Sequence, residues 1–124
     1  MTRCALAILL ALAIALPVQA QRLFERNALR GELVVTAPPE VLLNGKPARL
    51  SPGARIRNAR NLLQLSGTII DQKLLVHYTL DGFGQIQNVW ILTEAEVAKR
   101  PWPATPAEAA KWVFDPVQQA WTKP

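Results

Sequence analysis

The sequence predicts a mainly β protein: a small antiparallel β-barrel or β-roll of about six or seven short strands, followed by two short C-terminal helices. Three observations predict it. Short apolar stretches between residues 32 and 92 are separated by turn-forming Pro, Gly, Asn and Asp residues. The pair Asn44-Gly45 lies between two of these stretches, as in a tight hairpin. After Leu92 the pattern changes to helix-capping residues.

The first twenty residues have the pattern of an export signal. Arg3 precedes an unbroken apolar run from Ala5 to Leu16, and small residues precede a cleavage point after Ala20. This run is shorter than the roughly 20 apolar residues that cross a bilayer, so we expect no membrane span after cleavage. We therefore expect the mature chain in the periplasm, with secretion from the cell as the alternative.

The composition limits the chemistry of this mature chain. The 124-residue sequence carries a net charge of +5, which is a mild basic bias that favours acidic partners. Its single cysteine, Cys4, and its single methionine, Met1, both precede the cleavage point. The mature domain therefore has no disulfide, and we expect neither a soft-metal site nor a cofactor. A cysteine-free domain behind an export signal is typical of the bacterial periplasm.

We expect four segments: the signal peptide over residues 1–20, a lead-in over 21–31, the β-domain over 32–92 and a Pro/Trp-rich segment over 93–124. In the lead-in, Arg22, Arg26 and Arg30 recur every four residues, so either a short helix or a frayed terminus fits.

The β-domain begins with a strand over residues 32–36 and a hairpin around Asn44-Gly45. A two-residue loop pairs Leu43 with Lys46 and Glu40 with Arg49, which places opposite charges across the ladder. Pro47 cannot donate a ladder hydrogen bond, so we expect this hairpin at a sheet edge.

Further strands are expected over residues 55–57, 62–70, 74–80 and 86–92. A five-residue turn over 81–85 places Ile86, Trp90 and Leu92 on the same face as Val76 and Tyr78. A slip of one residue would exchange the two faces.

Two short helices are expected in the C-terminal segment. Thr93 and Glu96 form a capping box before a helix over residues 94–99. Thr105 is a second N-cap, and Pro106 occupies the first position of a helix that ends before Asp115.

The chain offers few groups for catalysis, and we assign no catalytic residue. His77 is the single histidine, and it shares the more polar face of its strand with Thr79. No nucleophile motif accompanies it, so a hydrogen-bonded or solvated histidine fits better than a catalytic base. A hydrolase that uses His77 is the third-ranked alternative.

Five cations form a candidate ligand-binding set within fifteen residues that contain no carboxylate. Arg55 and Arg57 are two positions apart on one strand, so they project from the same face. Such a patch could bind phosphate or carboxylate groups, although an ordinary solvated basic face has the same composition. An envelope polyanion such as lipopolysaccharide fits the expected location, and we expect no nucleic acid. The set is Lys46, Arg49, Arg55, Arg57 and Arg60.

Three tryptophans, Trp102, Trp112 and Trp121, form a candidate partner-contact set in the C-terminal segment. Aromatic side chains in a proline-rich tail can bind a partner, by stacking on sugar rings or by anchoring a protein interface. They can also fold back and plug the open end of a barrel. Both interpretations stay open at the level of sequence.

Residues 38–46, 50–57 and 101–106 together resemble a group of short exported proteins of Gram-negative proteobacteria that have no assigned activity. The resemblance covers nearly the whole mature chain and implies an exported protein, but it transfers no catalytic or ligand-binding residue. The stretch from Leu75 to Leu92 is also similar to the C-terminal domains of TonB-like energy transducers.

These observations predict an exported, periplasmic, non-catalytic binding or envelope-assembly module. In this hypothesis the hairpin and the Trp-rich tail contact an envelope protein. The alternative is binding of an anionic envelope polymer through the arginines.

Overall fold

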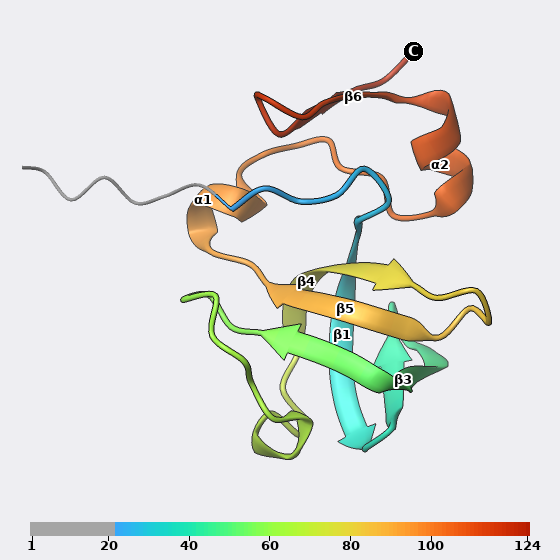
Figure 1. Cartoon of the computed structure of the whole chain (residues 1–124), viewed down its shortest axis with the longest axis vertical. Coiled ribbons are helices and arrows are strands. Elements are labelled where there is room, and N and C mark those ends of the chain that lie inside the picture. The colour runs from blue at the N-terminus through green and yellow to red at the C-terminus, as the bar shows by residue number, and fades with distance from the viewer. Residues whose placement is uncertain (1–21) are drawn as a thin grey trace, which may run out of the picture.

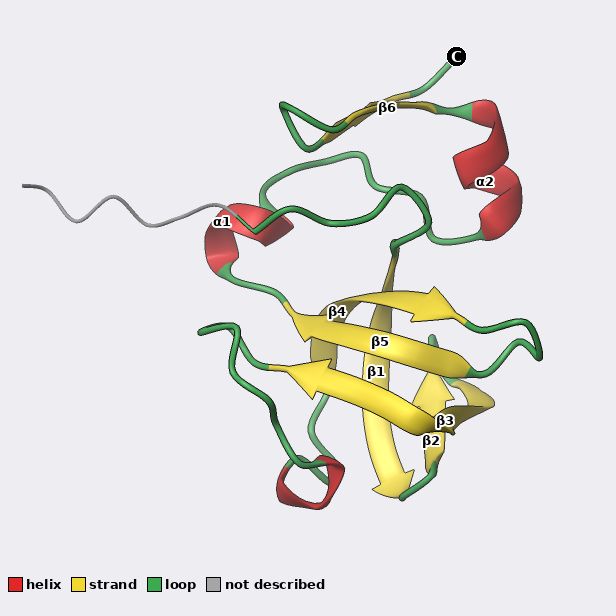
Figure 2. Ribbon diagram, viewed as in Figure 1, coloured by secondary structure: helices red, strands yellow, loops and turns green. Residues whose placement is uncertain are grey.

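The computed structural model describes residues 22–124, so the predicted signal peptide lies outside the described residues. Five strands form a closed barrel: β1 (Leu29–Ala37), β2 (Glu40–Leu43), β3 (Lys46–Arg57), β4 (Leu74–Leu80) and β5 (Ile86–Ile91). The 3₁₀-helix η1 (Ser66–Thr68) lies between β3 and β4. Helices α1 (Glu94–Val97) and α2 (Pro106–Lys111) follow, and β6 (Val113–Asp115) and β7 (Ala120–Thr122) form a separate two-stranded sheet. The prediction of a small, mainly β barrel with two short helices is confirmed (Figure 2).

The order of the barrel strands is β1-β2-β3-β5-β4, and β4 pairs with β1 to close the barrel. All neighbouring pairs are antiparallel except β3 and β5, which run parallel. The predicted hairpin register is confirmed, because Leu43 pairs with Lys46 and Glu40 with Arg49. The predicted sheet edge is wrong, since β2 pairs on both sides. Pro47 is tolerated because β3 pairs with β5 only from Leu50 onward.

Inward-facing side chains fill the barrel with a first apolar core. Alternate residues of β1 and β4 contribute to it, because successive side chains of a strand point to opposite faces. Each such side chain loses its contact with water, which stabilises the fold by about 1.5–3 kcal/mol for a Val, Leu or Ile. The most deeply buried members are Leu33, Val35, Val41, Val76, Ile86 and Val89.

A second apolar core lies on the outer wall of the barrel. The N-terminal segment and the chain beyond β5 form a cover over this wall, drawn above the barrel in Figure 1. Phe24, Ala28, Trp102 and Trp121 are buried there, and Trp90 packs against them from β5. The tryptophans of this segment thus fold back onto the outer wall, while Ala109 of α2 also packs against the barrel core. Residues 22–124 thus contain two apolar cores, one inside the barrel and one on its outer wall.

A β-bulge in β5 decides which side chains face the cover. The predicted five-residue turn is present, since Leu80 pairs with Ile86, but Thr79 pairs with Asn88. Gln87 is therefore an extra residue, and the strand beyond it is shifted by one position. Trp90 pairs with His77, so the prediction that it shares the face of Tyr78 is wrong.

Three other sequence expectations also differ from the structure. Residues 46–57 form one twelve-residue strand, where separate strands were expected. The stretch 62–70 is no strand, because it makes only an isolated bridge at each end and η1 between them. Arg22 to Ala28 form no helix, and a turn closed by the Ala28 amide and the Glu25 carbonyl (3.0 Å) takes its place. The β6–β7 hairpin was not expected.

Candidate functional site

Four side chains from four different strands form a row across the outer wall of the barrel. Arg57 of β3 pairs with Trp90 of β5, Trp90 with His77 of β4, and His77 with Arg30 of β1. Side chains at paired positions point to the same face of a sheet. The cover lies over His77, whereas Arg57 at the other end of the row is only partly buried. The row therefore runs from the second core towards solvent.

His77 is fully buried among aromatic rings. Its imidazole stacks on Trp102 with ring centroids 4.0 Å apart, and it meets Phe24 edge to face at 4.3 Å. Burial, followed by the charges of Arg30 and Arg22, lowers its pKa to about 2. The ring is therefore neutral, and its Nε2 accepts from Arg30 Nε at 3.2 Å. The proton must then lie on Nδ1, which has no hydrogen-bond partner among the described residues.

Arg30 ties the barrel to the end of α1. Its guanidinium donates to the carbonyl oxygens of Glu96 (2.8 Å), Val97 (3.2 Å) and Lys99 (3.0 Å). These carbonyls belong to the C-terminal turn of the helix, where backbone acceptors lack helical partners. Burial and the nearby Arg100 lower the pKa of Arg30, and Glu96 partly opposes them. A guanidinium stays protonated in proteins, so Arg30 is a buried cation with carbonyl partners.

Arg22 and Glu96 form a second anchor between the N-terminal segment and α1. Arg22 donates to both carboxylate oxygens of Glu96 and also to the carbonyls of Asn58 (3.0 Å) and Ile91 (2.8 Å). Glu96 completes the predicted capping box with Thr93. Burial alone would raise the pKa of Glu96, but the hydrogen bonds from Arg22 and Thr93 and the charge of Arg22 lower it.

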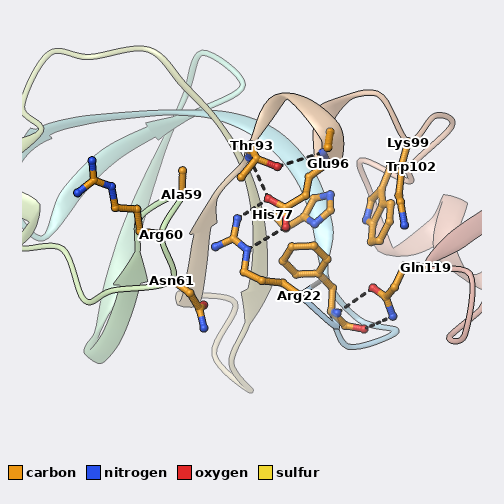
Figure 3. A pocket seen from close by; sticks show the side chains of 12 residues that line it. Arg22, Ala59, Arg60, Asn61, His77, Thr93, Glu96, Lys99, Trp102 and Gln119 are labelled. Atoms are coloured by element: carbon orange, nitrogen blue, oxygen red, sulfur yellow. Dashed lines mark hydrogen bonds and ion pairs between the residues drawn. The ribbon is translucent and has the colours of Figure 1, made fainter. Parts of the chain in front are cut away.

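A cleft of about 590 Å³ opens between the cover and the loop that follows β3 (Figure 3). Its inner wall contains the rings of Phe24, His77 and Trp102, and its outer wall contains Arg60 and Asn61. Arg60 forms no ion pair with any residue of the described chain. The cleft thus combines an apolar wall with an unpaired cation at its mouth. Its lining consists of Arg22, Phe24, Ala59, Arg60, Asn61, His77, Thr93, Ala95, Glu96, Lys99, Trp102 and Gln119.

The structure separates the five predicted cations into two groups. Lys46 and Arg49 lie at the start of β3, and Arg49 forms an exposed ion pair of 2.9 Å with Glu40. Arg55 and Arg57 lie at the end of the strand on its outer face, because Ile56 between them is buried in the barrel. Arg60 follows them in the loop that borders the cleft. We call Arg55, Arg57 and Arg60 the arginine strip.

The predicted partner-contact tryptophans are placed mainly in the interior. Trp102 and Trp121 are buried in the second core, and the Trp102 indole donates to the Ala28 carbonyl at 2.9 Å. Trp112 is half-buried, with Lys123 over its ring at 5.2 Å. Two of the three indoles therefore offer no surface to a partner.

Sequence reasoning missed the parts of the site contributed by Phe24, Arg22 and Arg30. The four-residue spacing of the arginines was visible, but it suggested a helix. Their partners lie 36 to 74 residues away along the chain, so no local pattern could identify them.

Within residues 22–124, no cluster of three or more His, Cys, Asp or Glu side chains is placed to hold a metal ion. No helix in the same range is long and apolar enough to cross a membrane. Comparison of the chain with protein-family models, with curated proteins and with solved structures finds no match.

Proposed function

We propose that this protein is an exported, periplasmic, non-catalytic binding module whose ligand is an anionic polymer of the cell envelope, such as lipopolysaccharide. The observation that carries the proposal is the arginine strip, which leads along the outer face of β3 to the mouth of the cleft. The export pattern of residues 1–20 supports the location.

The spacing of the strip suits a ligand with repeated negative charges. Arg55 and Arg57 are two residues apart on one face of a strand, a separation of roughly 6.5 Å. Arg57 also donates to the Asn61 carbonyl at 3.4 Å, so the strand end and the loop that carries Arg60 are joined. A guanidinium can bind phosphate, sulfate or carboxylate oxygens through two parallel hydrogen bonds.

The cleft gives such a ligand a second type of contact. Lys99 and the exposed side-chain amide of Asn61 line it, whereas the amide of Gln119 is buried and hydrogen-bonded to the backbone of Phe24 and Pro116. An anionic saccharide would contact Lys99 and Asn61 through its charged and hydroxyl groups, while the buried rings behind them form the floor of the cleft.

The strand order gives independent support. A five-stranded barrel in the order β1-β2-β3-β5-β4, closed by the β1–β4 pair and with β3 parallel to β5, has the topology of OB-type barrels. Barrels of that type bind oligonucleotides and oligosaccharides on the surface of β2 and β3 and on adjoining loops. Topology alone does not assign a ligand, so the argument depends on the arginine strip.

Two features favour a non-catalytic role. His77 is neutral and its Nε2 accepts from Arg30, so it is poorly suited to take a proton from a nucleophile. The one side-chain hydroxyl in the cleft lining belongs to Thr93, and it accepts the Glu96 amide in the capping box. The hydrolase alternative therefore has no supporting geometry, and the burial of Trp102 and Trp121 weakens the adaptor alternative.

The experiment measures binding of residues 22–124 to dextran sulfate, a soluble anionic polysaccharide without lipid. We expect binding that weakens as salt rises, and a loss of at least about tenfold when all three strip arginines are replaced by Ala. The matched control removes the same charge from exposed cations elsewhere, by Arg26→Ala, Arg100→Ala and Lys111→Ala. Equal losses for the two variants, or binding that is insensitive to salt, would overturn the proposal.

A further inference from the structure

Three leucines stand exposed on the connection between β3 and β4. Leu62, Leu63 and Leu65 are 59%, 68% and 76% exposed, although leucine is normally among the buried residues. Figure 1 shows this connection running along the outside of the barrel to η1, away from the cover. Three such side chains within four residues form an apolar surface that nothing in the described chain covers.

The backbone of this connection is tied to the barrel. The Leu62 amide donates to Asn58 Oδ1 at 3.1 Å, and the Gln64 amide donates to the Ile56 carbonyl at 2.7 Å. Leu63 also forms an isolated bridge with Arg57. The leucines are therefore exposed on a loop whose backbone is held to the barrel at several points.

The same loop is bordered by cations and lacks acidic groups. Residues 41–70 contain no Asp or Glu, whereas Arg57 and Arg60 lie within five residues of Leu62. The bridge of Leu63 to Arg57 places the strip beside the leucines in space as well as in sequence. An apolar surface next to unpaired cations is complementary to a surface that is apolar beneath a layer of negative charge.

We propose that this loop docks the protein onto a bilayer surface that carries anionic headgroups. Leu62, Leu63 and Leu65 would enter the boundary between headgroups and acyl chains, while Arg57 and Arg60 contact the lipid phosphates. The inference rests on the proposed function for the role of the arginines, and it adds that the anionic ligand is met at a lipid surface. A protein partner fits less well, because the leucines stand on a protruding loop and the surrounding charge has one sign.

The test is co-sedimentation of residues 22–124 with vesicles of phosphatidylcholine alone or mixed with phosphatidylglycerol. We expect binding to the anionic vesicles only. Replacing Leu62 and Leu65 together by Ser should weaken this binding by at least about tenfold, because the inserted apolar area is lost. Both side chains are exposed, so the variant should fold, and unchanged circular dichroism would confirm this.

Two controls separate this inference from the proposed function. The leucine variant should keep its affinity for dextran sulfate, whereas loss of the strip arginines should weaken binding to both. The second control is Phe83→Ser, which removes an exposed apolar side chain from the β4–β5 turn. This turn lies on the opposite side of the barrel from the leucines (Figure 1), so the variant should bind vesicles as the unmodified protein does.

Three outcomes would overturn the docking proposal: no vesicle binding by the unmodified protein, equal binding by the leucine variant, or an equal loss for Phe83→Ser. Binding to dextran sulfate in any of these cases would leave the proposed function standing.

Discussion

Replacing Arg22 by Met should destabilise the folded domain strongly, because it strips a buried carboxylate of its partner. The side chains of Arg22 and Glu96 are only 11% and 12% exposed. Arg22 also donates to two carbonyls, of Asn58 and Ile91, which would lose a donor. Breaking a buried ion pair on one side costs about 3–5 kcal/mol, whereas an exposed pair contributes about 1 kcal/mol or less.

Urea denaturation of the unmodified and variant domains measures this difference. For a domain of this size, a loss of about 3 kcal/mol corresponds to a fall in Tm of about 12 °C or more. Glu96→Gln keeps an acceptor for the capping box and removes the charge. Arg22→Met should therefore destabilise the Glu96→Gln variant by at least about 1 kcal/mol less than it destabilises the unmodified domain.

The pH dependence gives an independent check on the same pair. Arg22 lowers the pKa of Glu96, so the stability that this carboxylate contributes is present above its ordinary pKa and is lost as the pH falls through the lowered value. Without Arg22, only the hydrogen bonds from Thr93 would oppose the effect of burial, so the pKa of Glu96 should be higher than in the unmodified domain. The difference in free energy of unfolding between the unmodified domain and Arg22→Met should become smaller as the pH falls from neutral to about 3. A difference in free energy of unfolding that does not change with pH, or a destabilisation by Arg22→Met of less than about 1 kcal/mol, would refute the reasoning.

Three further predictions concern the two cores. The pKa of His77 is lowered from 6.5 to about 2, so the unfolded chain binds a proton that the folded domain excludes. The free energy of unfolding should therefore fall as the pH drops below 6.5. Urea denaturation at several pH values should show that His77→Gln removes this dependence of stability on pH. Gly31→Ala would place a Cβ 2.9 Å from Asn44 Oδ1 and 3.1 Å from Tyr78 Cε1, at a cost of about 1–3 kcal/mol, and a double variant with Asn44→Gly should recover part of it. Leu33→Ala should cost about 2–5 kcal/mol in the same assay, because this side chain is fully buried; a cost below about 1 kcal/mol would contradict its place in the barrel core.

Local signals in the sequence were reliable where the structure depends on neighbouring residues. Asn44 and Gly45 both have positive φ, as the tight turn requires, and the hairpin register followed from that turn. Thr93 and Thr105 cap their helices through contacts three residues along the chain, so each cap could be recognised without tertiary information.

The features that the sequence did not reveal depend on single insertions and on distant contacts. Gln87 shifts β5 by one residue, which exchanges the faces of Trp90 and Ile91, and no composition signal marks it. Leu62 to Ile70 has the apolar content of a strand, yet the five strands already form a closed barrel, which leaves no free edge for this stretch. The arginine strip was predicted as part of a larger set, but Lys46 and Arg57 lie at opposite ends of β3, because this stretch forms one twelve-residue strand that the sequence did not reveal.

The most direct measurement of the central claim is an NMR titration of isotope-labelled residues 22–124 with a short sulfated oligosaccharide. The account predicts that the largest changes in backbone amide shift lie at Arg55, Arg57 and Arg60 and along the cleft at Asn61 and Lys99. Shifts centred on the β6–β7 hairpin or on the Lys46 end of β3, with none at the arginine strip, would contradict it.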